Sequence, residues 1–168
     1  MLGIDPGYAI VGYGAIRFQG GQYNPLGFGA IITDADMPFN MRLEKIFNRT
    51  NEIINACKPD VMAIEKLYFQ NNQKTAICVA EARGVILLAA QLNGVEVCEY
   101  TPLQVKQAVT GYGQATKNQV MEMTRRLLKL KEVPKPDDTA DALAIAICHT
   151  HAQGSGLRQF MIKRGIGL

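Results

Sequence analysis

The chain has 168 residues, 48% of them hydrophobic, and a formal net charge of +3 at pH 7. This length predicts one domain with one core, and the small basic excess does not by itself indicate a nucleic-acid-binding protein. The four cysteines stand singly and Met1 leads straight into an apolar strand, with no run approaching the length of a membrane span. We therefore expect no zinc site, no membrane association and a cytoplasmic location.

The first apolar run, residues 2–7, ends in Asp5 followed by a Pro-Gly turn. It predicts a strand that delivers Asp5 to the edge of a sheet, where the carboxylate is fixed but accessible. The alternative is an ordinary hairpin whose turn contains an aspartate. Residues 10–16, whose glycines leave room for another backbone or a ligand, and residues 27–32 predict two further strands, so the chain opens with an antiparallel meander.

After the meander, the hydrophobic period changes to that of a helix. Residues 39–57 predict an amphipathic helix that a Lys-Pro pair ends. Residues 60–65 then predict a short apolar strand that ends in Glu65, which repeats the pattern seen at Asp5.

The segment from Gln73 to Asn93 is helical in pattern but apolar on more than one face. Two interpretations are open for it. The helix is either buried at the centre of the domain, or it packs an outer face that includes Leu88 and Ala89 on a second subunit. Residues 95–99 predict the last strand of the sheet.

Two shorter helices follow, and each carries a lysine near its start. A Thr-Pro pair predicts the start of the helix that carries Lys106, and a capping box opens a helix that runs from Lys117 through Leu130. Because a lysine near a helix start is electrostatically less favourable than an acid, an external anion would explain both residues. The alternative is a pair of solvated lysines.

The last predicted helix begins at Asp137 with a cluster of acids. Asp138 and Asp141 lie three residues apart on one face, which suits two ligands that converge on a metal ion. Acids in a first turn also favour the helix dipole, so the cluster does not require a function. We expect one domain over residues 1–152 and a basic, loosely ordered tail over residues 153–168.

The four acids point to a common function because the predicted topology can place them together. Asp5 and Glu65 end strands that can lie side by side, and the acidic helix start can bring Asp138 and Asp141 to the same edge. Four carboxylates at such range repel one another, so the site requires divalent cations. Oxygen ligands select magnesium or manganese, and two such ions support phosphodiester hydrolysis.

The sequence closely resembles the RuvC Holliday-junction resolvases of the RNase H-like superfamily, from Leu2 to about His151. The segments that carry the resemblance are residues 2–7, 63–65, 82–85, 105–107 and 138–144. The resemblance implies an α/β, RNase H-like fold, in which a five-stranded mixed sheet of a meander plus parallel strands is flanked by helices. It also implies a homodimer that cuts two strands of a four-way DNA junction symmetrically, in recombination and repair, beside a branch-migration complex.

The same resemblance implies roles for individual residues. The implied catalytic metal ligands, for two Mg²⁺ ions that Mn²⁺ can replace, are Asp5, Glu65, Asp138 and Asp141. The residues implied to face DNA are Lys106, Lys117 and one of the aromatic pair Tyr68 and Phe69. The family has an aromatic residue that contacts the unstacked crossover, and we favour Tyr68 for that role.

Three rival functions fit parts of this pattern. A junction-binding module that does not cut needs the basic surface but not four acids. A sugar-kinase or actin-like ATPase also opens with a Gly-Ile-Asp-x-Gly strand, but it needs two copies of the domain, for which the chain is too short. Another RNase H-like nuclease is the nearest alternative, because the sequence does not define the shape of the substrate.

Overall fold

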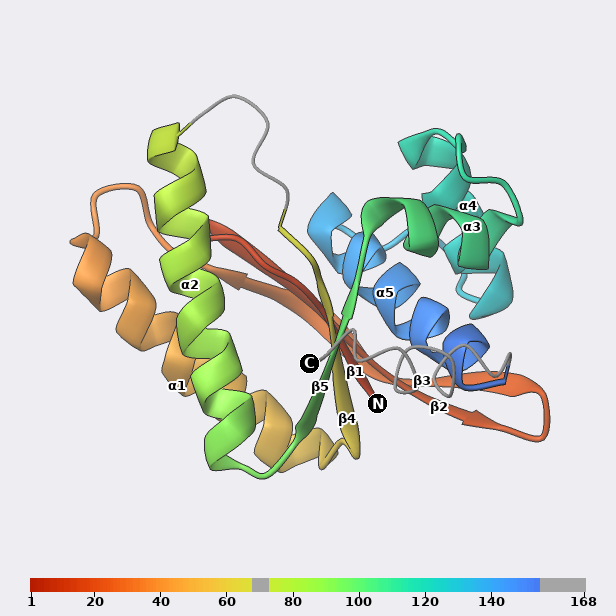
Figure 1. Ribbon diagram of the computed structural model, residues 1–168, viewed down its shortest axis with the longest axis horizontal. Helices are drawn as coiled ribbons and strands as arrows, with labels where there is room; N and C mark the ends of the chain where they lie inside the picture. Colours follow the sequence, from red (N-terminus) through yellow and green to blue (C-terminus); the bar gives the residue numbers. More distant parts are fainter. Residues whose placement is uncertain (68–72, 155–168) are drawn as a thin grey trace, which may run out of the picture.

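The computed structural model describes residues 1–67 and 73–154. Its strands are β1 (Leu2–Asp5), β2 (Ile10–Gln19), β3 (Gln22–Ile32), β4 (Val61–Glu65) and β5 (Glu96–Tyr100). Its helices are α1 (Phe39–Cys57), α2 (Gln73–Leu92), α3 (Pro102–Thr110), α4 (Lys117–Leu127) and α5 (Asp137–Gly154). The elements follow the predicted order, and they confirm the predicted α/β class (Figure 1).

The sheet has five strands in the order β3-β2-β1-β4-β5. β1 to β3 pair antiparallel, which confirms the meander, and β1, β4 and β5 pair parallel. In the β1–β4 register Ile4 lies opposite Ile64. Asp5 follows Ile4 on β1, and Glu65 follows Ile64 on β4. The prediction that these two acids end strands lying side by side is therefore confirmed.

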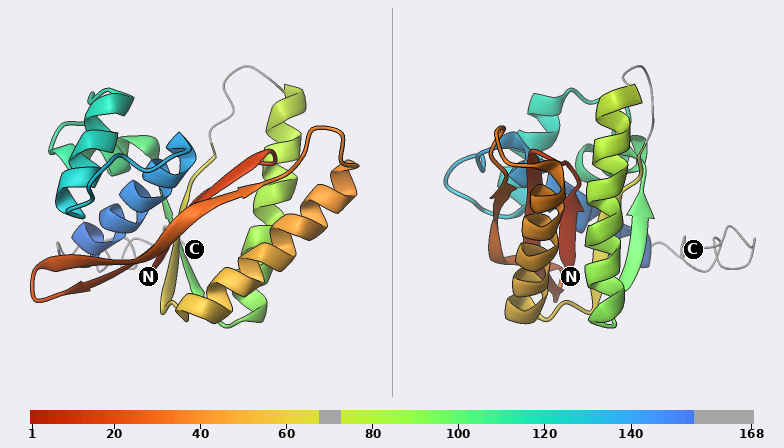
Figure 2. Two further views of the ribbon diagram at one scale, coloured as in Figure 1. Left: turned by 180° about the vertical axis from the view of Figure 1, so that it is seen from behind. Right: turned by 90° about the vertical axis from the view of Figure 1, so that its left-hand side faces the viewer.

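Helices cover both faces of the sheet, α1 and α2 on one side and α3 to α5 on the other (Figures 1 and 2). One core cluster, which includes Ile4 and Ile86, lies on the α1–α2 side. A second, which includes Ile16 and Leu143, lies on the α5 side. Each of these buried side chains stabilises the fold by about 1.5–3 kcal/mol relative to leaving it exposed.

The glycines of the meander allow α5 to lie against the sheet at backbone distance. A Cβ atom added to Gly3 would lie 2.0 Å from the Ala142 carbonyl oxygen, and one added to Gly12 would lie 1.9 Å from that of Asp138. Of the two predicted partners for these glycines, a backbone or a ligand, the structure has a backbone, that of α5. This contact places the first turn of α5 against β2.

Helix α2 is not the fully buried helix of the first interpretation. Its inner side is buried at Ala82, Ile86 and Ala89, whereas Leu88 is 50% exposed and Ile77 is 60% exposed. The placement of Ala89 on the outer face is wrong, because this residue is 0% exposed and packs in the core. The exposed apolar residues lie on the opposite side and are left without a covering element in the described chain.

The same helix corrects the expectation about membrane-length runs. Residues Thr75–Leu92 are apolar and long enough to cross a membrane by length and composition, so the expectation that no run reaches that length is wrong. The high hydropathy arises because one helix carries both a core face and an exposed apolar stripe. A single helix of this kind is weak evidence for a membrane span, since α2 also packs against α1 and β5.

Helix α4 ends earlier than predicted. Both capping boxes are present, at Thr101 and at Thr116, where each threonine accepts a hydrogen bond from the backbone three residues on. The helix was expected to run through Leu130, but it stops at Leu127. Lys129 has a φ of 53°, a left-handed conformation that cannot continue the helix.

Candidate active site

The four predicted acids come from three elements that meet at one end of the sheet. Asp5 ends β1, Glu65 ends β4, and Asp138 and Asp141 lie in the first turns of α5. The register pairs Asp5 with Gly12, and Gly12 is where the backbone of Asp138 touches β2. The fold therefore brings the acidic helix start to the strand end that carries Asp5, as the sequence predicted.

The other three acids lie close enough to Asp5 to change its pKa. Burial, followed by the charges of Glu65, Asp141 and Asp138, raises the pKa of Asp5 to about 8. Asp5 and Glu65 also share a side-chain hydrogen bond. Burial raises the pKa of Glu65 as well, although the bond from Asp5 opposes that rise. At neutral pH one carboxyl of the pair therefore retains a proton when no cation is bound.

The exposed side chain of Lys117 reaches the acid cluster. Its Nζ lies 3.1 Å from Oδ2 of Asp141 and 3.7 Å from Oδ2 of Asp137. Burial lowers the pKa of Lys117, but the hydrogen bond and charge of Asp141 outweigh it, so the pKa rises overall. In turn burial raises the pKa of Asp141 while Lys117 lowers it. The sequence pattern did not indicate Asp137 as a partner of Lys117.

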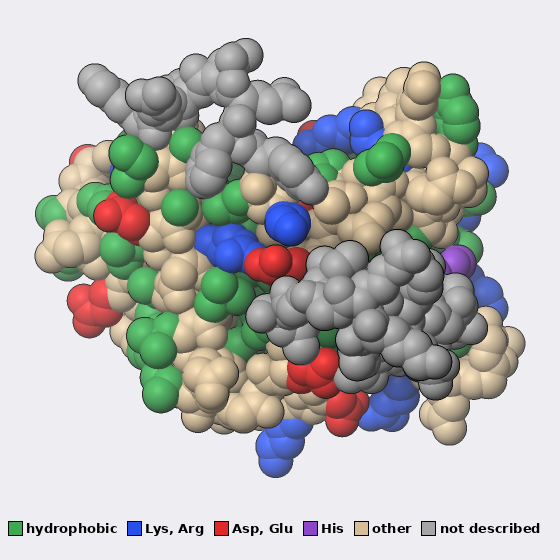
Figure 3. All heavy atoms as spheres, in the orientation of Figure 1, with side chains coloured by type: hydrophobic (Ala, Val, Ile, Leu, Met, Phe, Trp, Pro, Cys, Tyr) green, Lys and Arg blue, Asp and Glu red, His purple; other side chains and the backbone are tan. Residues whose placement is uncertain are grey.

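A hollow joins these groups to the second predicted lysine. It has a volume of about 190 Å³, and its lining is Glu65, Pro102, Val105, Lys106, Lys117, Val120, Asp141 and Ile145. Two carboxylates and two lysines thus share one concavity between β4, α3, α4 and α5. On the face drawn in Figure 3, acidic and basic side chains meet near the middle of the molecule.

The donor set fits hard divalent cations. Carboxylate oxygens are the ligands that Mg²⁺ prefers. Burial, and then the charges of the neighbouring acids, raise the pKa of Asp5, and a bound cation would offset both effects. Within residues 1–67 and 73–154, no three His, Cys, Asp or Glu side chains stand ready to enclose a metal ion. The acids instead satisfy one another and Lys117, through the Asp5–Glu65 hydrogen bond and the Asp141 ion pair.

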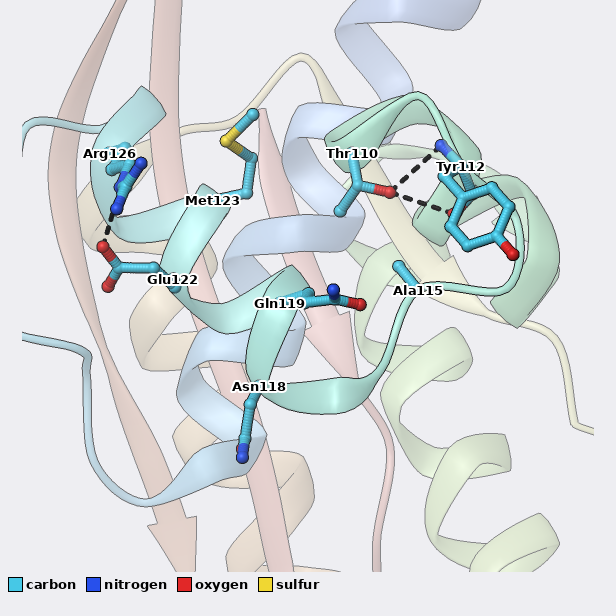
Figure 4. Close-up of a pocket in the computed structure, with 8 residues that line it drawn as sticks. All are labelled: Thr110, Tyr112, Ala115, Asn118, Gln119, Glu122, Met123 and Arg126. Carbon is cyan, nitrogen blue, oxygen red and sulfur yellow. Dashed lines mark hydrogen bonds and ion pairs between the residues drawn. The ribbon is translucent and has the colours of Figure 1, made fainter.

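A larger hollow of about 510 Å³ lies along α4 and the α3–α4 loop (Figure 4). Figure 4 shows Glu122 reaching Arg126 at one end, and Tyr112 beside Thr110 at the other. Glu122 also accepts hydrogen bonds from Arg125, and these two arginines lower its pKa to about 2. This carboxylate is fully paired and does not converge with other acids, so the hollow lacks the chemistry of the first site.

The family comparison shows which family the chain belongs to. The model of the family "Crossover junction endodeoxyribonuclease RuvC" matches residues 1–149. This chain belongs to the RuvC family. A RuvC relative from Brevibacillus brevis is 58% identical over 91% of both chains, and one from Desulforamulus reducens is 53% identical over 89% of this chain and 91% of the relative. These names make the chain a nuclease of the hydrolase class.

Solved structures agree with the RuvC assignment. The structure of Thermus thermophilus RuvC in complex with a Holliday junction substrate has a TM-score of 0.88 and 37% identity, and covers 92% of this chain and 94% of that one. The yeast mitochondrial Holliday junction resolvase Ydc2 has a TM-score of 0.65 over 96% of this chain and 82% of its own. At 15% identity, that second likeness shows the fold alone.

Of the residues predicted to contact DNA, Tyr68 and Phe69 lie outside the described residues.

Proposed function

We propose that this chain is a structure-selective endonuclease that resolves four-way DNA junctions by paired, symmetric, metal-dependent hydrolysis of phosphodiesters. The observation that carries the proposal is the convergence of Asp5, Glu65 and the acids of α5, of which Glu65 and Asp141 line one hollow together with two lysines. The RuvC family to which the chain belongs supplies the junction as substrate. Recombination and repair are the processes in which such junctions arise.

Magnesium is the proposed cofactor, with two ions in each active site and manganese as a substitute. The residues that would hold it are Asp5, Glu65, Asp138 and Asp141. Bound there, the ions would supply an activated water and charge stabilisation for the leaving oxygen. The high pKa of Asp5 supports this proposal, because the cluster holds a proton where a cation would otherwise balance its charge.

The chain's own residues position the DNA. Lys106 and Lys117 would contact phosphates, since both line the hollow that contains Glu65. Lys117 would also keep Asp141 ionised, because their ion pair opposes the effect of burial. Tyr68, or Phe69 in its place, would stack on a base of the unstacked crossover.

A homodimer is the proposed assembly. Two cuts at symmetric positions require two active sites, and this chain carries one such acid cluster in its described residues. The exposed stripe of α2, defined here as Ile77, Leu88 and Leu92, is the surface that we assign to the second copy. Exposed apolar stripes of this kind commonly mark interfaces. We further propose a cytoplasmic location and work beside a branch-migration complex.

The test compares cleavage of a synthetic four-way junction with that of a matched linear duplex. Wild-type protein should cut only the junction, in magnesium, at two symmetric positions, and Asp5→Asn should bind it without cutting. Equal cleavage of the duplex would favour a general RNase H-like nuclease, and binding without any cleavage would favour a recognition module. Magnesium should also raise the thermal midpoint of wild-type protein more than that of Asp141→Asn.

A further inference from the structure

Asp137 is an acid of the active-site region that lies outside the four proposed metal ligands. It is the first residue of α5, and its side chain is 46% exposed. Its Oδ2 lies 3.7 Å from Lys117 Nζ, and its Oδ1 lies 3.7 Å from Lys135 Nζ. Each oxygen of this carboxylate therefore faces one lysine, at the distance of an ion pair.

The helix dipole explains an acid at this position but not its two partners. An acid in a first turn is favourable whichever side chains surround it. The lysines that meet Asp137 come from other parts of the chain, since Lys117 begins α4 and Lys135 lies in the loop before α5. The positive end of the α4 dipole makes a cation at Lys117 unfavourable, so this lysine depends on acids outside its own helix. Those acids are Asp137 and Asp141.

The two acids that pair with Lys117 differ in what else they do. Asp141 Oδ2 lies 3.1 Å from Lys117 Nζ, and Asp141 lines the hollow with Glu65 and is a proposed metal ligand. Asp137 lies four residues earlier, about one turn away on the same side of α5, and is not one of those ligands. A carboxylate that binds a cation attracts a lysine less strongly. When Asp141 serves as a ligand, Asp137 is therefore the acid that remains to pair with Lys117.

We propose that Asp137 is a positioning residue, which keeps Lys117 directed at the acid cluster while Asp141 serves as a metal ligand. Lysine has a flexible four-carbon side chain, so an ion-pair partner limits the conformations that it samples. Held in this way, Lys117 Nζ stays within reach of the phosphate that is cut. Lys135, on the other oxygen, orients the Asp137 carboxylate. The inference rests on the proposed nuclease function and assigns Asp137 no contact with DNA or metal.

The effects of charge and of positioning have opposite signs, which makes Asp137→Asn a sharp test. Removal of a negative charge beside the DNA should by itself strengthen junction binding and should not slow cutting. We expect Asp137→Asn to bind a labelled four-way junction in calcium at least as tightly as wild type. In magnesium, with junction at saturation, it should cut about threefold to fivefold more slowly, the range that an exposed ion pair supplies. Unchanged or faster cutting overturns the proposal.

Glu132→Gln is the matched control, and Asp137→Glu is the conservative variant. Glu132 is exposed, lies in the loop before α5 and forms no ion pair with another described residue. Its substitution makes the same charge change and should leave the cutting rate unaltered. Asp137→Glu keeps the charge and should restore most of the rate. If Asp137→Asn does not fold, Asp137→Ser, which also suits a helix start, takes its place.

A double-mutant cycle separates positioning from a purely structural role. If Asp137 acts through Lys117, Asp137→Asn should not slow cutting further in the Lys117→Ala protein. A structural role slows cutting equally in both backgrounds, and that result overturns the proposal. Reductive ¹³C-methylation supplies a readout that does not depend on activity. In calcium without DNA, the Lys117 methyl signal should differ from that of free lysine in wild type but not in Asp137→Asn, and identical signals in the two proteins overturn the proposal.

The failure of this inference is distinguishable from that of the proposed function. The nuclease proposal depends on the preference of wild-type protein for cutting a four-way junction over a duplex, which is measured first. If that preference is absent, the proposed function fails irrespective of Asp137. If it is present and Asp137→Asn cuts at the wild-type rate, only the positioning role is lost.

Discussion

Asp5 and Glu65 end neighbouring parallel strands and share a hydrogen bond between their carboxyl groups. Such a bond requires a proton on one of the two, and the pKa of about 8 places it on Asp5. The metal-free site is therefore a protonated pair beside an aspartate–lysine ion pair. It stores electrostatic repulsion that the folded chain must offset elsewhere.

The first prediction is that Asp5→Asn stabilises the metal-free protein at neutral pH. The pKa of Asp5 is 3.8 in its ordinary state and about 8 in the fold. The native state thus holds a proton that the unfolded chain has lost, so stability is full below the ordinary pKa and falls as pH rises through the folded one. A pKa difference of one corresponds to about 1.4 kcal/mol, so a gain of several degrees is expected at pH 8.

Calorimetry of both proteins in chelator from pH 4 to pH 8 measures this effect. The thermal midpoint of Asp5→Asn should exceed that of wild type by an increasing margin as pH rises. Asp36→Asn, at an exposed acid, is the control and should follow wild type. Parallel curves for Asp5→Asn and wild type would show that Asp5 has an ordinary pKa.

The second prediction separates the two lysines. Lys117→Ala and Lys106→Ala should each lower the salt slope of junction binding by about one, because each removes a phosphate contact. Only Lys117→Ala should also lower the thermal midpoint at pH 8, since it removes the ion pair with Asp141. Lys106 shares the hollow but has no ion pair in the described residues, which makes it the matched control. Equal thermal midpoints would refute a role for Lys117 in balancing the acids.

The third prediction concerns two consecutive residues of α2. Leu88→Glu places a charge on the exposed stripe and should give a folded protein that no longer dimerises. Ala89→Glu places the same charge in the core, where an unpaired carboxylate costs several kcal/mol, and should unfold the chain. Sedimentation and circular dichroism distinguish these outcomes. A Leu88→Glu protein that is folded and still dimeric would move the interface to another surface.

The fourth prediction concerns Tyr68, whose proposed role is to hold the crossover open. Stacking on an aromatic ring contributes about 1–3 kcal/mol per base, comparable to the cost of unstacking a step. Tyr68→Ala should slow cleavage of an intact junction by about tenfold or more without loss of fold. Cleavage should recover on a junction with unpaired bases built in at the crossover. An equal defect on both substrates would indicate a role in positioning the scissile strand, and Phe69→Ala provides the comparison.

Much of the site was predictable because its signals are local. A strand that ends in an acid, twice, and a helix that begins with acids are visible in short stretches around Asp5, Glu65 and Asp138. The threonine caps of α3 and α4 are local in the same way. Strand pairing then follows from chain topology, so the convergence of the acids could be inferred without coordinates.

The features that could not be predicted depend on contacts between distant residues. The ion pair of Lys117 with Asp141 and the stacking of Arg42 on Tyr8 join elements that have no sequence pattern in common. On α2, hydrophobicity alone does not distinguish Leu88 from Ala89, because both are apolar and only their facing differs. The early end of α4 depends on the backbone of Lys129, a residue type that does not signal a left-handed turn.

The contact of Gly12 with the carbonyl of Asp138 has a consequence for how the site can change. Because main chain meets main chain there, the spacing between the strand acids and the helix acids is as stiff as the peptide backbone. Any side chain at this glycine would displace the start of α5 and widen the spacing. Single substitutions can therefore replace the ligands of this centre one at a time, but they cannot enlarge it gradually to suit a bigger ion.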